Sequence, residues 1–200
     1  MKRNFLSRNS LPFSTCLAIM LVIVWVWVPS LGRLQEAKKR IEKLDSYPNE
    51  PIKITEITAG RRSVRLGDDF VGSDDWLKTA ELTVKNTSNK DIVFVEIELN
   101  FPETKTSGDE MSFPLRLGSR PGTAIGKPPV VLKDGDESTL TLQGKRYEQL
   151  AEFLGQRHLI SAITRMIVDP HIVIFADGTA WSKGRSFRMD PTNPNRYIPN

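Results

Sequence analysis

From Pro51 onward, apolar residues recur at every second position, and this alternation limits the possible folds more than any other feature. The clearest case is the segment 93–101, VFVEIELNF, in which apolar and polar residues alternate. A period of two puts successive side chains on opposite faces of a strand, so one face can pack on a core while the other meets water. The pattern predicts a mostly β domain over residues 51–200.

Other segments follow the same period. Residues 80–85 alternate, and the turn-forming sequence NTSNK separates them from 93–101. We therefore expect these two strands to form an antiparallel hairpin. Residues 62–66 are expected to pair with the strand at 53–57, and 111–117 to form a further strand.

One segment departs from this period. The apolar residues of 147–154 recur at helical spacing, and we expect Gly155 to end that helix. The segment 160–168 fits either a helix or a strand, and its β-branched residues favour a strand. Seven or eight short strands with one short helix predict an immunoglobulin-like β-sandwich.

The segment 171–184 is typical of a hairpin around Asp177-Gly178. An Asp-Gly pair favours a two-residue type I′ turn, because glycine adopts positive φ without a steric clash at Cβ. That turn would pair Ile174 with Trp181. The proline-containing tail 190–200 is expected to lie across the sandwich as an extended C-terminal arm.

A second constraint lies near the N-terminus. Residues 11–31 contain no charged side chain and include the uninterrupted apolar run LAIMLVIVWVWV. A helix that spans a bilayer needs about 20 apolar residues, whereas the apolar core of a cleaved signal has about 7–15, and the segment fits both. Trp25 and Trp27 favour a retained transmembrane anchor, while the small residues at 30–32 leave cleavage open.

Residues 1–10 form a basic tail that contains Lys2, Arg3 and Arg8. Without these three, the chain has 25 basic and 24 acidic residues, so its net charge of +4 does not indicate a nucleic-acid-binding face. We expect a single-pass membrane protein whose domain is extracytoplasmic, or a secreted protein if the segment is cleaved. Counting the lysines and arginines after the apolar run favours the reverse orientation, and that alternative stays open.

Residues 32–50 connect the apolar run to the domain. The apolar residues of 34–44 recur at helical spacing, which predicts a short amphipathic juxtamembrane helix. Pro48 and Pro51 cannot continue a helix, so a linker follows and we place the domain boundary at Pro51.

Two motifs mark the last quarter of the chain, the sequence DGTAW and, after a spacer, DPTNPNRY. They resemble a signature of uncharacterised bacterial exported or membrane-anchored immunoglobulin-like proteins, and the segment 82–101 is similar to the central hairpin of such domains. The matching residues are Asp177, Gly178, Thr179, Trp181, Asp190, Pro191, Asn193, Pro194, Arg196 and Tyr197. The resemblance implies an exported sandwich and no catalytic residues.

Sequence motifs for nucleotide, serine-hydrolase and zinc-protease chemistry are missing. The single cysteine, Cys16, lies in the apolar run, so an internal disulfide is excluded. His158 and His171 fit no local metal motif, and we expect one at the surface and one at a sheet edge. These observations favour a non-catalytic binding or scaffolding module of the cell envelope, without a cofactor, whose partner is a protein or a carbohydrate.

Two alternatives remain open. A hydrolase of envelope polysaccharide needs two carboxylates about 5–10 Å apart across a cleft. A calcium-stabilised adhesive domain could use the sequence GDDFVGSDD, although its spacing does not match an EF-hand and a solvated acidic loop is the simpler interpretation. The candidate calcium ligands are Asp68, Asp69, Asp74 and Asp75.

Overall fold

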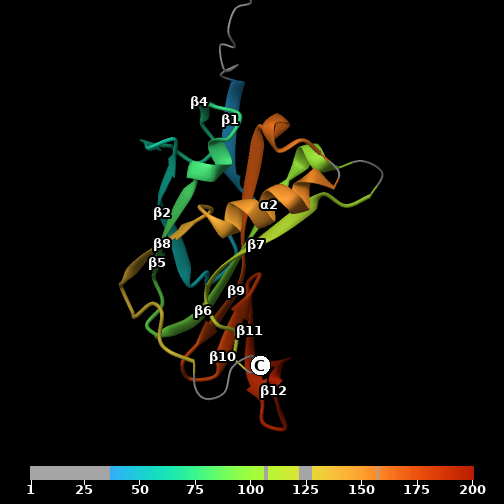
Figure 1. Cartoon of the computed structure of the whole chain (residues 1–200). Coiled ribbons are helices and arrows are strands. Elements are labelled where there is room, and N and C mark those ends of the chain that lie inside the picture. Colours follow the sequence, from blue (N-terminus) through green and yellow to red (C-terminus); the bar gives the residue numbers. More distant parts are fainter. Residues whose placement is uncertain (1–36, 106–107, 122–127, 157) are drawn as a thin grey trace, which may run out of the picture. The chain divides into compact units, whose positions relative to one another are not determined.

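The computed structural model describes residues 37–105, 108–121, 128–156 and 158–200, and strands dominate them (Figure 1). These residues contain twelve strands, more than the seven or eight expected, with one α-helix and three 3₁₀-helices. In chain order they are β1 (Ala37–Lys43), β2 (Ile52–Ala59), β3 (Arg62–Ser63), β4 (Asp69–Gly72), η1 (Trp76–Thr79), β5 (Glu81–Asn86), β6 (Ile92–Phe101), η2 (Pro102–Thr104), β7 (Met111–Gly118), β8 (Glu137–Thr141), α2 (Lys145–Gly155), η3 (Ile160–Ala162), β9 (Arg165–Phe175), β10 (Thr179–Ser182), β11 (Arg185–Asp190) and β12 (Asn193–Pro199).

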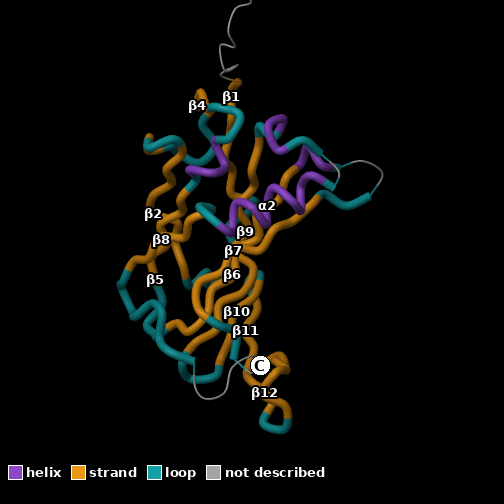
Figure 2. The backbone as a smooth tube through the Cα atoms, viewed as in Figure 1, coloured by secondary structure: helices purple, strands orange, loops and turns teal. Residues whose placement is uncertain are grey.

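The strands form two sheets, which confirms the mostly β prediction and is consistent with a β-sandwich (Figure 2). One sheet has four strands in the order β3-β2-β5-β8. The other has eight, with the path β12-β11-β10-β9-β1-β4 and with β6 and β7 joined to it through β9. Strand β9 is therefore the centre of the larger sheet.

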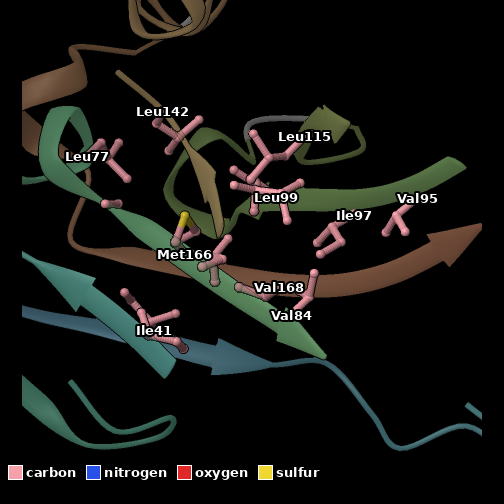
Figure 3. Close-up of a cluster of buried hydrophobic side chains, with 14 of the residues drawn as sticks. Ile41, Leu77, Val84, Val95, Ile97, Leu99, Leu115, Leu142, Met166 and Val168 are labelled. Carbon is pink, nitrogen blue, oxygen red and sulfur yellow. The ribbon is translucent and has the colours of Figure 1, made fainter. Parts of the chain in front are cut away.

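Side chains from both sheets share one hydrophobic core (Figure 3). Val84 comes from β5 in the smaller sheet, and Val95, Ile97 and Val168 come from β6 and β9 in the larger one. All four are fully buried. Burial of apolar surface stabilises a fold by about 25 cal/mol per Å², so this shared core explains why the period of two in 93–101 predicts the correct inward face.

Strands β5 and β6 do not form the expected hairpin, because they belong to different sheets. The buried side chain of Asn86 stabilises the turn between them. Its amide donates hydrogen bonds to the carbonyls of Lys90, at 2.8 Å, and Leu132, at 3.2 Å, while its Oδ1 accepts one from the backbone N–H of Ser88. This Asx turn leads from one sheet to the other instead of pairing adjacent strands. The expected pairing of β2 with β3 is confirmed, and it joins Thr58 to Ser63 and Ala59 to Arg62.

The described part of the expected juxtamembrane helix, residues 37–43, is strand β1. It pairs with β4 in the antiparallel sense and with β9 in the parallel sense. Hydrogen bonding to β4 and β9 on its two edges stabilises β1 as a strand more than its weak helical spacing of apolar residues favours a helix. Lys39 and Ile41 are buried at alternate positions, as expected of a strand. The domain boundary at Pro51 is therefore wrong, because β1 belongs to the same compact unit as the other strands. The predicted membrane segment 11–31 lies outside the described residues.

Helix α2 matches the expected position, and it buries Leu150 and Leu154. The ring of Phe153 lies 6.1 Å from that of Phe113 on β7, so the helix packs against this strand. The helix includes Gly155 and has Gln156 as its C-cap, so its end was predicted one residue early. The ambiguous segment 160–168 divides into η3 and the start of β9.

The hairpin of β9 and β10 differs from the prediction by one residue. Trp181 lies opposite Val173, not Ile174, because residues 176–178 make a three-residue loop. Gly178 has φ of +84°, which fits the left-handed position that closes such loops. The tail does not cross the sandwich as an arm, because β12 pairs with β11 at the edge of the larger sheet.

Candidate functional site

Strand β9 leaves part of one edge without a neighbouring strand. On one edge it pairs with β6, and on the other it pairs with β1 over residues 165–168 and with β10 over residues 173–174. The four residues 169–172 therefore face no strand on this edge in the described part of the chain. A register shift against β6 lies in the same stretch and makes His171 an additional residue. Bulges of this kind often redirect a side chain beside a functional site.

Lys183 places a positive charge in this opening. It begins the two-residue turn with Gly184 between β10 and β11, and its φ of +46° is uncommon for a residue with a Cβ atom. Its Nζ lies 3.0 Å from Asp169 Oδ2 and 3.9 Å from Glu98 Oε2. Burial by itself would lower the pKa of Lys183, but the hydrogen bond and charge of Asp169 outweigh it and raise the pKa. The ammonium thus neutralises a carboxylate that is only 1% exposed.

The linker between β1 and β2 covers this opening. Tyr47 donates a hydrogen bond to Asp169 Oδ1 at 3.2 Å, and burial, assisted by the charge of Asp169, raises the pKa of the phenol. The Tyr47 ring meets the Trp181 ring edge-on at 5.8 Å, and Trp181 Nε1 donates to the carbonyl of Pro48 at 3.2 Å. A Cβ atom on Gly184 would come within 2.9 Å of Pro48 Cδ, so this turn requires glycine.

His171 and Glu98 complete the polar group. His171 Nδ1 is buried and has no hydrogen-bond partner, although Glu98 Oε2 is 3.4 Å away. Possible ligand atoms of Glu98, Asp169 and His171 lie within 4.8 Å of one another. The alternation in 93–101 does not predict this group, because it places Glu98 on the polar face of the strand, which is expected to meet water. The available signal was Asp169, an acidic residue within the apolar run IVDPHIVIF.

A groove of about 530 Å³ lies beside Trp181. Its two aromatic lining residues, Phe175 and Trp181, are only 8% and 3% exposed, and we call them its floor. The polar residues that line it, which we call its rim, include the loop 87–90 that follows the Asn86 turn. The lining residues are Asn49, Glu50, Pro51, Thr87, Ser88, Asn89, Lys90, Phe175, Thr179, Ala180, Trp181, Ser186 and Asn200.

Lys90 is held in place at the rim of this groove. Its Nζ lies 2.7 Å from Asp177 Oδ2, donates to Thr179 Oγ1 at 3.0 Å, and sits 5.4 Å from the centre of the Phe175 ring. Burial would raise the pKa of Asp177, but hydrogen bonds from Lys90 and Thr179 outweigh it and hold the pKa at about 2. A lysine with three such partners has little freedom to lose when it binds a ligand.

The two signature motifs make the same local turn. The backbone N–H and hydroxyl of Thr179 donate to Asp177 Oδ1 at 2.9 and 2.6 Å, and those of Thr192 donate to Asp190 Oδ1 at 2.9 and 2.7 Å. Hydrogen bonds of this kind stabilise tight turns. Both aspartates of the repeated Asp-x-Thr pattern therefore have a structural role, which is to stabilise a turn. Asp177 and Thr179 of the first turn also hold Lys90 in place.

The other signature residues lie on β10 and the β11–β12 hairpin. Trp181 reaches both the groove and the linker, as described above. Tyr197 packs beside a cluster formed by Val93, Phe94, Ile174 and Ala180, and burial raises the pKa of its phenol. Pro191 is an exposed turn residue, and Asn193, Pro194 and Arg196 belong to β12.

The acidic sequence 68–75 is not one continuous loop, because Asp69 begins strand β4. Arg40 Nη1 lies 3.8 Å from one Asp69 oxygen, and Lys38 Nζ lies 3.9 Å from the other. This carboxylate therefore has cationic neighbours on β1.

The three other candidate calcium ligands flank that strand. Asp68 is exposed and precedes it, and Asp74 is half-buried and follows it. Asp75 accepts a hydrogen bond from the hydroxyl of Ser73 at 2.6 Å. Among the described residues, Glu98, Asp169 and His171 form a group that could hold a metal ion, and none of the four aspartates belongs to that group.

Comparison of the chain with protein-family models, with curated proteins and with solved structures found no match. Across the described residues, no helix has both the length and the apolar character needed to cross a bilayer. The function must therefore be inferred from the geometry of the groove and of the polar group beside it.

Proposed function

We propose that this chain is a membrane-anchored, extracytoplasmic β-sandwich module that binds a carbohydrate of the cell envelope without transforming it. The observation that carries the proposal is the groove around Lys90, which combines a prearranged cation, a polar rim and a buried aromatic floor.

The rim suits a ligand rich in hydroxyl groups. Four of the polar lining residues are exposed, namely Thr87, Asn89, Ser186 and Asn200. Hydroxyl and amide groups can both donate and accept hydrogen bonds, as sugar hydroxyls do. Because Phe175 and Trp181 are almost fully buried, they provide an apolar floor and not a flat stacking platform.

The carboxyl groups give less support to a hydrolase. A glycosidase needs two carboxyl groups that face each other across a cleft, whereas Glu50 alone among the described lining residues of the groove has an acidic side chain. Glu50, which lines the groove, is bound by Lys43 at 2.6 Å. We therefore favour binding over hydrolysis.

The anchor and its orientation rest on the sequence. The uncharged segment 11–31 supports membrane attachment, and the basic tail 1–10 supports an extracytoplasmic domain. We also propose that the sandwich core is immunoglobulin-like, a proposal supported by its two sheets around one core. Protease treatment of intact spheroplasts should digest residues 37–200, and a domain that stays protected until the membrane is lysed would contradict this orientation.

Carbohydrate binding can be tested with the full chain in mild detergent on an array of bacterial envelope polysaccharides. Asn89→Ala and Lys90→Ala should each weaken binding to the selected polysaccharide, Lys90→Ala by roughly tenfold, the effect of losing about 1.4 kcal/mol. Lys133→Ala is the matched control, because Lys133 is an exposed lysine outside the groove. No binding by the wild type, or equal binding by all four proteins, would contradict the proposal.

A further inference from the structure

We propose that Glu98, Asp169 and His171 form a binding site for a divalent transition-metal ion such as Zn²⁺, and that Lys183 competes with the metal for this site. The site is separate from the groove, so its test does not depend on the proposed carbohydrate binding. The argument uses the geometry of the three side chains, the state of the histidine nitrogen and the position of the lysine ammonium.

The geometry is close to that of a coordinated ion. With metal–ligand bonds of about 2.1 Å, ligand atoms around a tetrahedral zinc ion lie about 3.4 Å apart. The three possible ligand atoms already lie within 4.8 Å of one another. Asp169 is fixed in the sheet, whereas the side chains of Glu98 and His171 are half-buried and can move the remaining distance. One imidazole and two carboxylates are a donor set that suits zinc and leaves a coordination position open.

His171 supplies an independent observation. Its Nδ1 is buried and makes no hydrogen bond, and an unsatisfied buried polar atom destabilises the folded state. The contact of 3.4 Å with Glu98 becomes an ion pair only when the imidazole is protonated. In the neutral ring, a bond from the Nδ1 lone pair to a metal ion would satisfy this nitrogen.

Lys183 shows that the site attracts cations. Its Nζ approaches both Asp169 and Glu98, so a positive charge already lies between the carboxylates. One ammonium balances only one of the two carboxylates when both are ionised, whereas a divalent ion balances both. The lysine side chain is 41% exposed, so it can turn into solvent when a metal ion binds.

The competition has a measurable signature. Lys183→Met keeps the length of the side chain but removes its charge, so buried Asp169 loses its partner. The metal-free variant should melt at a lower temperature than the wild type. Zn²⁺ should bind it at least tenfold more tightly and raise its melting temperature by more than it raises that of the wild type, because ligand binding stabilises the folded state.

The experiment uses the full chain in mild detergent, without a polyhistidine tag and after treatment with a chelator. Zn²⁺ is titrated by calorimetry, and Co²⁺ is titrated by visible absorption, which reports the coordination geometry. We expect one ion per chain. His171→Ala and Glu98→Gln should each weaken binding at least tenfold, while His158→Ala, a change at the other histidine of the chain, should not alter it.

Three results would overturn the proposal. They are no Zn²⁺ binding by the wild type at millimolar concentration, binding that His171→Ala and Glu98→Gln leave unchanged, and no gain in affinity in Lys183→Met. The melting temperature of each metal-free variant shows whether it is folded. If His171→Ala does not fold, Glu98→Gln decides the outcome, because this change preserves the shape of a half-buried side chain.

Discussion

The Nζ atom of Lys183 lies 3.0 Å from Oδ2 of Asp169, although the lysine belongs to a surface turn and the aspartate is buried in the middle of β9. The two partners are unequal, because the lysine can reach water and the aspartate cannot. A buried carboxylate that loses its cation is costly, whereas a lysine that loses its anion can become solvated.

This inequality predicts the effects of single substitutions. Lys183→Met should destabilise the metal-free chain by about 3 kcal/mol, because it removes the ion-pair partner of the buried Asp169 carboxyl group. Asp169→Asn should cost about 1 kcal/mol, because an amide oxygen can still accept the hydrogen bond from Tyr47. Urea unfolding of both variants measures this difference. A larger loss in Asp169→Asn would show that the lysine does not stabilise a trapped charge.

Asp177 should make stability depend on pH in the acidic range. Its pKa is about 2 in the folded chain, below the ordinary value of 3.8. The stabilisation from this depressed pKa is therefore present above pH 3.8 and is lost as the pH falls through about 2. Asp177→Asn should remove this part of the acid dependence, as measured by thermal melting from pH 5 to about pH 2. Parallel curves for the two proteins would contradict the assignment.

Trp181 should hold the linker between β1 and β2 in place. Trp181→Phe removes the hydrogen bond to Pro48 and reduces the contact with Tyr47, and we expect a loss of about 2 kcal/mol. Hydrogen exchange should increase in residues 45–51. The matched change Trp76→Phe removes a hydrogen bond to Ile163 instead, so it should not affect the exchange of this linker in the same way. Equal effects of both changes on residues 45–51 would argue against a local role.

Asn86 should be among the least replaceable polar residues of the core. Asn86→Ala leaves the carbonyls of Lys90 and Leu132 without their amide donor and breaks the Asx turn with Ser88. We expect a loss of about 2–4 kcal/mol in urea unfolding, since the change removes these hydrogen bonds and each is worth about 0.5–1.5 kcal/mol. A loss below 1 kcal/mol would mean that the backbone alone makes the crossing between the sheets.

The sequence predicts local features of this fold better than its pairings. The alternation in β6 identifies Val95 and Ile97 as core residues, because burial of one strand face depends on a local period. That period does not indicate which strand lies next to which. The crossing at Asn86 and the mixed pairing of β1 therefore depend on non-local contacts that no short pattern encodes.

The same limit applies to the two candidate sites. Asp177 and Trp181 could be singled out in advance, because they belong to a recognisable turn motif. The sequence does not show that Glu98 and Asp169 belong to one site, because they lie opposite each other only through the register of β6 and β9. Alternation alone places Glu98 on a solvated face, and only the fold shows that Lys183 and His171 share its surroundings.

The central claim, that the groove around Lys90 binds an envelope carbohydrate, is tested most directly by hydrogen exchange of the full chain with the polysaccharide selected on the array. We predict slower exchange in residues 87–90 and 179–181, which line the groove, and unchanged exchange in 137–141, which form β8. Unchanged exchange in both groove segments, or protection confined to other parts of the chain, would contradict the account.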